Sequence, residues 1–170
     1  MKRSSTARRP ATRSEARALA HPLRLRILRL CLDEALTNRE LATRLREQPA
    51  TVLYHVRTLA KNGFLIVQTE RRGRRGAREI PYRATRKSWT LEFEPRGSEL
   101  VAAVDAFRAE LLEAGAESVL QQARLGVRLR PAVLARLRRR IDAAVMAAHD
   151  ADDPEGEPVS LYIGLHRREG

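Results

Sequence analysis

The sequence predicts an α+β protein that is mostly helical, and three observations support this. Apolar residues recur at helical spacing through most of the 170-residue chain. Two β-prone runs, FLIVQTE and REIPYRAT, flank the glycine-containing loop RRGRRGA and predict a hairpin. Charge is unevenly divided: residues 1–89 hold 22 Lys and Arg against 7 Asp and Glu, whereas residues 90–170 hold 11 against 14. A basic half joined to a near-neutral half is typical of a polyanion-binding module with a separate assembly module.

The N-terminal residues 1–16 predict a flexible basic arm, because they are polar and rich in Ser, Thr and Arg. Two roles stay open for this arm: a segment that lies along DNA, as homeodomain arms do, and a disordered solubilising tail. Residues 17–96 are expected to form the first folded domain, and residues 97–170 a C-terminal helical region.

The first helix of that domain is expected over Ala18–Leu32, where apolar residues keep helical spacing. His21-Pro22 places the proline near the helix start. Cys31 is in register with the apolar face and predicts a small core residue rather than a reactive thiol. A single cysteine excludes an internal disulfide framework and a cysteine-cluster zinc site.

Residues 37–65 predict two short helices joined by a tight turn, which is a helix-turn-helix. Thr37 and Glu40 form a capping box that starts the first helix. Pro49 opens the second helix, and Asn62-Gly63 ends it.

The outward face of the second helix predicts a surface for DNA. Opposite the apolar stripe of Val52, Val56 and Leu59, this face carries Ala50, Thr51, Tyr54, Arg57 and Thr58, and almost no acidic group. A helix fits the major groove, where Arg reads guanine and hydroxyls contact bases or phosphates. An ordinary amphipathic helix with a polar outer face is the alternative. His55 borders the stripe, so a histidine that is hydrogen-bonded inside the domain is expected there.

The predicted hairpin carries a tip rich in arginine: Arg71, Arg72, Arg74 and Arg75, with Arg78 just behind. A solvated charged loop is the alternative, but such loops usually mix signs. Arginine alone, beside a helix-turn-helix, favours contact with phosphate or the minor groove. Pro81 lies in the return strand and is expected to confine that strand to a sheet edge, because proline donates no ladder hydrogen bond.

Helix, helix-turn-helix and hairpin in this order predict a winged helix. The segments ALAHPLRLRILRL, TNRELATRL and ATVLYHVRTLAKNGFL, followed by a basic wing, resemble the ArsR-type bacterial transcriptional regulators over residues 17–88. The resemblance implies an intracellular DNA-binding homodimer that controls nearby genes. Metal-sensing members carry a cysteine pair in the first helix of the helix-turn-helix, whereas TNRELATRL has none, so no metal site is expected.

The C-terminal region predicts a helical dimerisation region that ends in a short strand. One long helix is expected from Ser98 to about Leu125, with an apolar face at Leu100, Val104, Phe107, Leu111 and Val119/Leu120. A second copy of the chain is the economical cover for this face, and packing on its own wing domain is the alternative. A further helix is expected over 131–148. Alternating apolar residues over 159–165 predict a strand.

The chain is therefore interpreted as a sequence-specific, dimeric regulator that binds double-stranded DNA at a pseudo-palindrome. The predicted DNA contacts are Gln48, Ala50, Thr51, Tyr54, Arg57, Thr58, Arg71, Arg72, Arg74, Arg75 and Arg78. Two rivals stay open: an architectural protein that binds nucleic acid without sequence choice, and a winged module that binds acidic proteins. No nucleophile–base pair, phosphate loop or cofactor motif predicts an enzyme, and a small-molecule effector is left open.

The expected location is the cytoplasm. No apolar run approaches the roughly 18 residues of a membrane span, and the N-terminus lacks the apolar core of a signal peptide.

Overall fold

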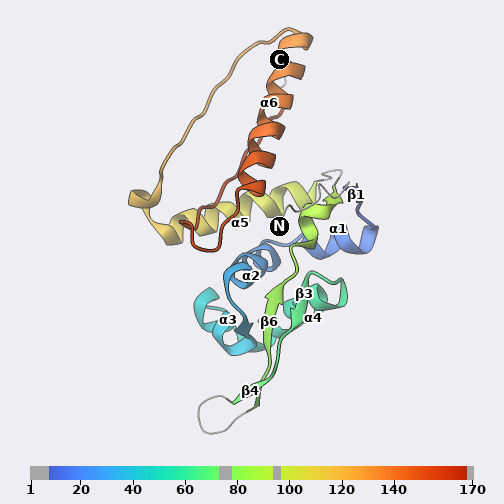
Figure 1. Ribbon diagram of the computed structural model, residues 1–170, viewed down its shortest axis with the longest axis vertical. Coiled ribbons are helices and arrows are strands. Elements are labelled where there is room, and N and C mark those ends of the chain that lie inside the picture. The colour runs from blue at the N-terminus through green and yellow to red at the C-terminus, as the bar shows by residue number, and fades with distance from the viewer. Residues whose placement is uncertain (1–7, 73–77, 94–96, 168–170) are drawn as a thin grey trace. The chain divides into compact units, whose positions relative to one another are not determined.

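The computed structural model describes residues 8–72, 78–93 and 97–167 and divides the chain into two compact units (Figure 1). The first unit runs from Thr6 to Ala116, and the second contains residues 117–170 together with residues 1–5. The boundary between these two units falls after residue 116.

The first unit confirms the predicted class, a mostly helical α+β fold with a winged helix-turn-helix. Its elements follow in the order β1 (Arg9–Pro10), α1 (Arg13–Leu19), α2 (Pro22–Asp33), β2 (Leu36–Thr37), α3 (Asn38–Leu45), α4 (Pro49–Lys61), β3 (Leu65–Val67), β4 (Arg71–Arg72), β5 (Arg78–Glu79), β6 (Pro81–Ala84), the 3-10 turn η2 (Lys87–Thr90), β7 (Leu91–Glu92) and α5 (Ser98–Ala114).

The expected flexible arm is wrong for the part of it that the structure describes. Strand β1 pairs in parallel with β7, and α1 begins at Arg13. Thr12 and Glu15 form a second capping box, in which the Thr12 hydroxyl accepts from the Glu15 amide at 3.2 Å. The polar composition of this segment does not predict the helix. Glu15 is nevertheless buried, because ion pairs with Arg9 and Lys87 neutralise its charge. Residues 1–7 lie outside the described part of the chain.

The helix expected over Ala18–Leu32 is two helices, α1 and α2, which are separated at Ala20-His21. Pro22 is the first residue of α2, where its missing N–H costs no hydrogen bond. The residue before a proline is pushed out of the helical region, and His21 accordingly has extended backbone angles. His21 Nδ1 caps α2 by accepting from the Leu23 amide at 3.2 Å.

The helix-turn-helix is confirmed at both ends. The Thr37–Glu40 capping box is complete, with the Glu40 amide 3.2 Å from the Thr37 hydroxyl and the Thr37 amide 2.8 Å from Glu40 Oε2. Helix α4 begins at Pro49, and the chain turns away at Gly63, whose φ of +72° lies in the left-handed region that glycine tolerates.

The hairpin is also confirmed, and we call residues 65–84 the wing. Strand β6 pairs antiparallel with β3 on one side and with β2 on the other, giving the sheet order β2-β6-β3. The expected edge position of the return strand is therefore wrong. Pro81 is the first residue of the central strand, a position where proline is accepted. Further out, β4 and β5 continue the wing away from the helices (Figure 1).

The core of the first unit lies among α2, α3, α4 and the sheet. Ile27 and Cys31 of α2 meet Leu41 of α3 and Val52, Val56 and Leu59 of α4, and all six side chains are fully buried. The predicted core position of Cys31 is confirmed, and burial raises the pKa of its thiol to about 12. Phe64, just before the wing, is the largest fully buried side chain among the described residues.

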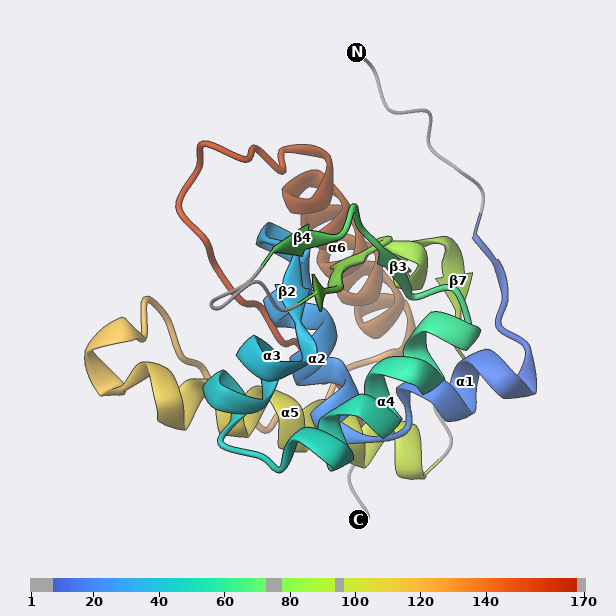
Figure 2. The ribbon, with the colours of Figure 1, turned by 90° about the horizontal axis from the view of Figure 1, so that it is seen from below.

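Helix α5 packs along α2 and buries Ala102 and Ala106 (Figure 2). The helix expected to reach Leu125 ends at Ala114, because Gly115 follows with φ +86° and stops it. Val119 and Leu120 therefore do not continue the α5 stripe.

The second unit holds the short 3-10 turn η3 (Ala116–Ser118) at the junction and α6 (Pro131–Asp150), which confirms the helix expected over 131–148. No strand occurs over residues 159–167: the alternation is present, but no neighbouring strand pairs with it in the described part of the chain. None of the described helices is both long and apolar enough to span a bilayer.

Candidate nucleic-acid interface

Helix α4 presents a continuous exposed face without an acidic side chain. Ala50, Thr51, Tyr54 and Arg57 are all exposed on it, with 66% of Tyr54 open to solvent. The opposite side of the helix is anchored by the fully buried Val52, Val56 and Leu59. Arg57 makes no ion pair with any described residue. The helix thus offers a rigid support with hydroxyls, one phenol and one guanidinium pointing outward.

The two remaining predicted contacts on this helix are placed differently. Gln48 is the residue before the first turn, is exposed, and makes no side-chain capping bond. Thr58 is half-buried, and its hydroxyl donates to the Tyr54 carbonyl oxygen at 2.9 Å. Thr58 can still accept a hydrogen bond, but its donor is in use.

Behind this face, a buried arginine joins α1, α2 and α4. Arg24 donates from Nε to the Ala18 carbonyl at 2.5 Å and from Nη2 to the Arg17 carbonyl at 2.8 Å, which satisfies the end of α1. Its Nη1 lies 3.3 Å from His55 Nδ1, so His55 accepts and carries no proton there. The predicted internal, hydrogen-bonded role of His55 is confirmed.

His55 stays neutral because of where it lies. Its side chain is buried, and its ring centroid lies 4.4 Å from that of His21. Burial, with the neighbouring His21 and Arg24, lowers the pKa of His55 to about 4. Burial and Arg24 lower the pKa of His21 as well.

The turn between α3 and α4 is held from both sides. Arg46 adopts a left-handed conformation with φ +55° and closes α3, so the chain can reverse direction. Asn38 Nδ2, at the start of α3, donates to the Pro49 carbonyl at 3.0 Å. This bond ties the N-terminal ends of the two helices together.

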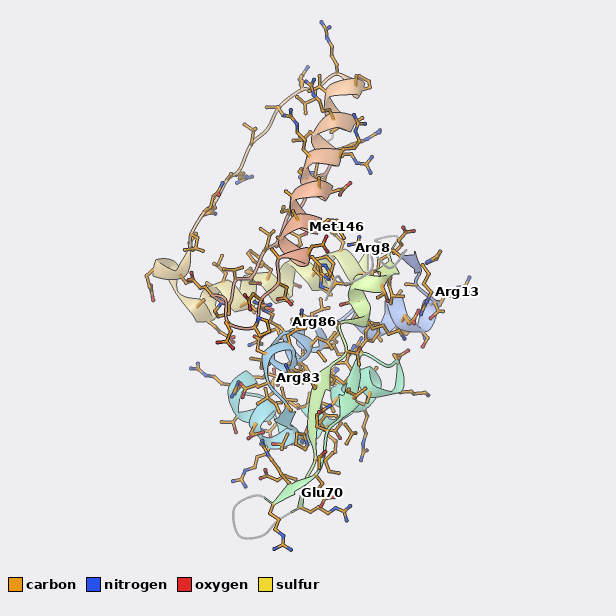
Figure 3. All side chains as sticks on the ribbon, viewed as in Figure 1. Arg8, Arg13, Glu70, Arg83, Arg86 and Met146 are labelled. Atoms are coloured by element: carbon orange, nitrogen blue, oxygen red, sulfur yellow. The ribbon has the colours of Figure 1, made fainter. Side chains whose placement is uncertain are left out.

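The arginines of the wing are not alike. Arg71 is bound to two carboxylates, Glu40 and Glu79, and Arg78 is ion-paired with Glu70 near the lower end of the wing (Figure 3). Arg72 is exposed and makes no ion pair with a described residue. Arg74 and Arg75 lie outside the described residues. The expected tip of arginine alone therefore has acidic partners at its base.

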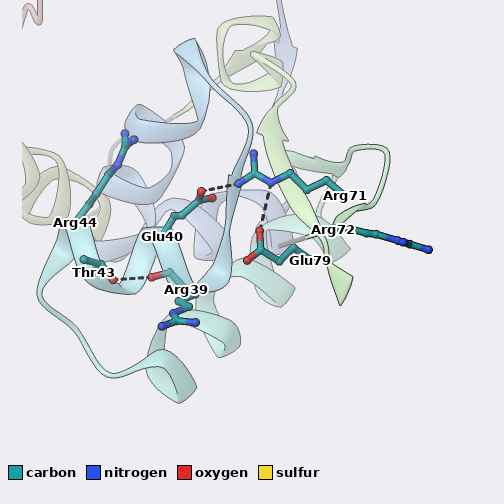
Figure 4. A pocket seen from close by; sticks show the side chains of 7 residues that line it. All are labelled: Arg39, Glu40, Thr43, Arg44, Arg71, Arg72 and Glu79. Atoms are coloured by element: carbon teal, nitrogen blue, oxygen red, sulfur yellow. Dashed lines mark hydrogen bonds and ion pairs between the residues drawn. The ribbon is translucent and has the colours of Figure 1, made fainter. Parts of the chain in front are cut away.

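A surface groove separates α3 from the wing and has a volume of about 570 Å³. Its lining consists of Arg39, Glu40, Thr43, Arg44, Arg71, Arg72 and Glu79. The guanidinium of Arg71 lies between the two carboxylates, while Arg72 points away from them (Figure 4). Burial raises the pKa of Glu40, but hydrogen bonds from Thr37 and Arg71 outweigh it, and this pKa lies below its ordinary value.

A second charged cluster ties the N-terminal segment to the end of α4. Glu15 accepts from Arg9 at 2.6 and 2.9 Å and is ion-paired with Lys87 Nζ at 2.7 Å. Lys87 Nζ also donates to the Asn62 carbonyl at 2.7 Å. These partners hold the pKa of Glu15 well below its ordinary value. The end of α4 is thus fixed by a residue that belongs to the expected arm.

Sequence reasoning missed the partners of this surface more than the surface itself. Glu40 was identified only as a helix cap, and Glu15 was assigned to a flexible segment. The signal for Glu15 was present in Thr12-x-x-Glu15, which repeats the pattern of Thr37-x-x-Glu40. The Arg71–Glu40 contact spans 31 residues and has no local sequence signature.

Comparison with known families agrees with this geometry: residues 19–68 match the model of a family described as a helix-turn-helix domain. The chain therefore contains a helix-turn-helix domain, and its strands add a wing to that domain. No curated protein matches it. Among solved structures, the chain is similar to reduced HlyU from Vibrio cholerae, with 20% identity over 54% of this chain and 80% of that one, at a TM-score of 0.38. It is also similar to a mutant of ZitR from Lactococcus lactis in the apo form, with 17% identity over 78% and 86% of the two chains, at a TM-score of 0.35.

Proposed function

We propose that this protein is a transcription regulator of the ArsR-like type and that it recognises a specific, pseudo-palindromic DNA operator as a homodimer. The observation that carries the proposal is the exposed face of α4, a helix anchored in the core. This face combines hydroxyls, Tyr54 and Arg57, and Arg57 has no ion-pair partner among the described residues. A helix of this kind docks in the major groove, and an arginine there reads guanine through two hydrogen bonds. Gln48, Ala50, Thr51 and Thr58 complete this base-facing set.

The wing supplies the sequence-independent part of the binding. Arg72, Arg74, Arg75 and Arg78 neutralise phosphates beside the groove that α4 enters, and the excess positive charge of residues 1–89 adds to this attraction. Backbone contacts of this kind position the protein, while α4 chooses the sequence.

Homodimerisation is supported by the outer face of α5. Ala102 and Ala106 are buried where α5 packs along α2, and the opposite side of the helix carries the exposed Leu100 and Val104. A stripe of exposed large apolar residues on one helix is typical of an interface. A two-fold pair of chains places two α4 helices about one DNA turn apart, ~10–10.5 bp between half-site centres. The expected place of action is the nucleoid in the cytoplasm.

Selection of bound sites from random duplexes tests this proposal directly. We expect a palindromic consensus with half-sites about one turn apart. Binding that recovers no consensus, yet weakens steeply with salt, favours an architectural protein without sequence choice. Absence of duplex binding at low salt favours a winged module that binds acidic proteins.

A further inference from the structure

Arg71 is the one described wing arginine that joins the wing to another element through its side chain. Its Nη2 donates to Glu40 Oε1 of α3 at 2.5 Å, and its Nε lies 3.4 Å from Glu79 Oε2 of β5. The guanidinium is a planar fork with fixed donors, so two carboxylates on different elements define its position. The side chains are half-exposed, with 44% of Arg71 and 40% of Glu40 open to solvent.

Glu40 connects this contact to the start of α3. Its Oε2 accepts from the Thr37 amide at 2.8 Å and from the Thr37 hydroxyl at 2.9 Å, which completes the helix cap. Its other oxygen, Oε1, is left to accept from Arg71. Because the capped helix holds the carboxylate still, the wing is attached to a rigid point of the helix-turn-helix.

The neighbouring arginine has the opposite environment. Successive side chains of a strand point to opposite faces, and Arg72 accordingly points away from both carboxylates (Figure 4). Arg72 is exposed and has no ion-pair partner among the described residues, so it is the arginine of β4 that a phosphate reaches without competition.

We propose that Arg71, held within the wing by Glu79, is a positioning residue that clamps the wing to α3 through Glu40, and that it does not contact DNA. The clamp rests on the proposed function: it holds β4 and β5 at a set distance from the helix-turn-helix, so that these strands and α4 meet the duplex together. Because the wing is already held in place in the free protein, less conformational entropy is lost when DNA binds, and the affinity for DNA is higher.

Whether Glu40→Gln strengthens or weakens DNA binding distinguishes a clamping role of Arg71 from a direct contact of Arg71 with DNA. Glu40→Gln removes a negative charge from a DNA-facing groove, and Gln is accepted at this position of a capping box. If Arg71 binds phosphate, its release from Glu40 strengthens DNA binding. If Arg71 is a clamp, its release weakens DNA binding, by about two- to fivefold for a half-exposed pair. Glu79→Gln, which does not touch the helix cap, must act in the same direction.

The experiment measures affinity of the full chain for its selected operator at several salt concentrations. We expect Glu40→Gln, Glu79→Gln and Arg71→Gln to weaken binding without changing the slope of log affinity against log salt. Arg72→Gln is expected to flatten that slope by ~0.9 per subunit. Glu70→Gln is the matched control, because it removes a carboxylate that pairs with Arg78 within the wing; it should leave binding unchanged or tighten it. Tighter binding by Glu40→Gln, or a flattened slope in Arg71→Gln, overturns the clamp.

A second measurement needs no DNA. Amide hydrogen exchange of the free chain should be faster at residues 71–72 and 78–79 in Arg71→Gln and Glu40→Gln than in Glu70→Gln. Equal protection in these variants overturns the clamp. A chain that binds no duplex contradicts the proposed function instead, and the exchange measurement still decides whether the clamp exists.

Discussion

Lowering the pH should destabilise the first unit through His55, and the structure gives the size of the effect. Its folded-state pKa is about 4, against an ordinary value of 6.5. Between these pH values His55 binds a proton in the unfolded chain but not in the folded chain. The contribution of neutral His55 to the unfolding free energy is therefore fully present above about pH 7 and decreases as the pH falls towards 4. From about pH 8 to about pH 5, this one group costs about 2 kcal/mol of unfolding free energy. His21, whose pKa is lowered too, adds a loss of the same sign.

The assay is chemical unfolding of the full chain at several pH values from about 8 to about 5, for three proteins. His55→Gln keeps an oxygen that accepts from Arg24 but removes the titrating ring, so its stability should depend less on pH by about 2 kcal/mol over this range. Tyr54→Phe is the control: it keeps the ring whose centroid lies 5.2 Å from that of His55, and it should retain the full pH dependence. Equal stability of the unaltered chain at both ends of the range, or an unchanged slope in His55→Gln, would refute this reasoning.

Three further predictions address specificity, assembly and chemical reactivity. Arg57→Ala should cost ~1–3 kcal/mol per half-site on the selected operator and much less on a scrambled duplex; an equal loss on both would make Arg57 a phosphate contact. Val104→Glu, on the outer face of α5, should raise the dimer dissociation constant at least ~10-fold by burying a charge at the interface, and light scattering should then give half the mass. Cys31 should react with a thiol reagent only as fast as the chain unfolds, because the buried thiol has a pKa of about 12 and the thiolate is the nucleophile; fast labelling without denaturant would contradict its core position.

Local patterns in the sequence predicted most of the helix-turn-helix, because the signals that start and stop its helices are local. Thr37 and Glu40 cap α3, Pro49 opens α4, and Gly63 follows its end, and each works through bonds or backbone angles within a few residues. Two further local signals lie where the prediction failed. Thr12 and Glu15 form a capping box within the segment expected to be a flexible arm, and Gly115 ends α5 within the segment expected to be one long helix.

Errors about the sheet have a different origin. The two β-prone runs predict the hairpin, and Pro81 predicts an edge position because proline donates no ladder hydrogen bond. The second neighbour of this strand, β2, consists of only Leu36-Thr37, which is too short a run to identify as a strand from the sequence. Likewise, residues 159–165 alternate as a strand does, yet alternation predicts which face is apolar and says nothing of a partner.

In the candidate interface, too, features that depend on one segment could be predicted, and contacts between distant segments could not. The exposure of Tyr54 and Arg57 follows from helical periodicity within one segment, and it was predicted. Three contacts join residues 31 or more positions apart: Arg71 with Glu40, Arg24 with His55, and Glu15 with Lys87. Such pairs depend on how the elements pack against one another. The sequence therefore shows which residues are charged, but it does not show which partner residue each of them contacts.

The attachment of Glu15 to Lys87 also decides how the DNA-binding part can be isolated. A fragment that starts at residue 17 loses the carboxylate that neutralises Lys87, and with it strand β1, the partner of β7. A fragment that stops at residue 96 uncovers the side of α2 on which α5 packs. A piece that runs from Thr6 to Ala116 keeps every one of these contacts, so trimming at the apparent domain edges removes supports of α4 rather than spare chain.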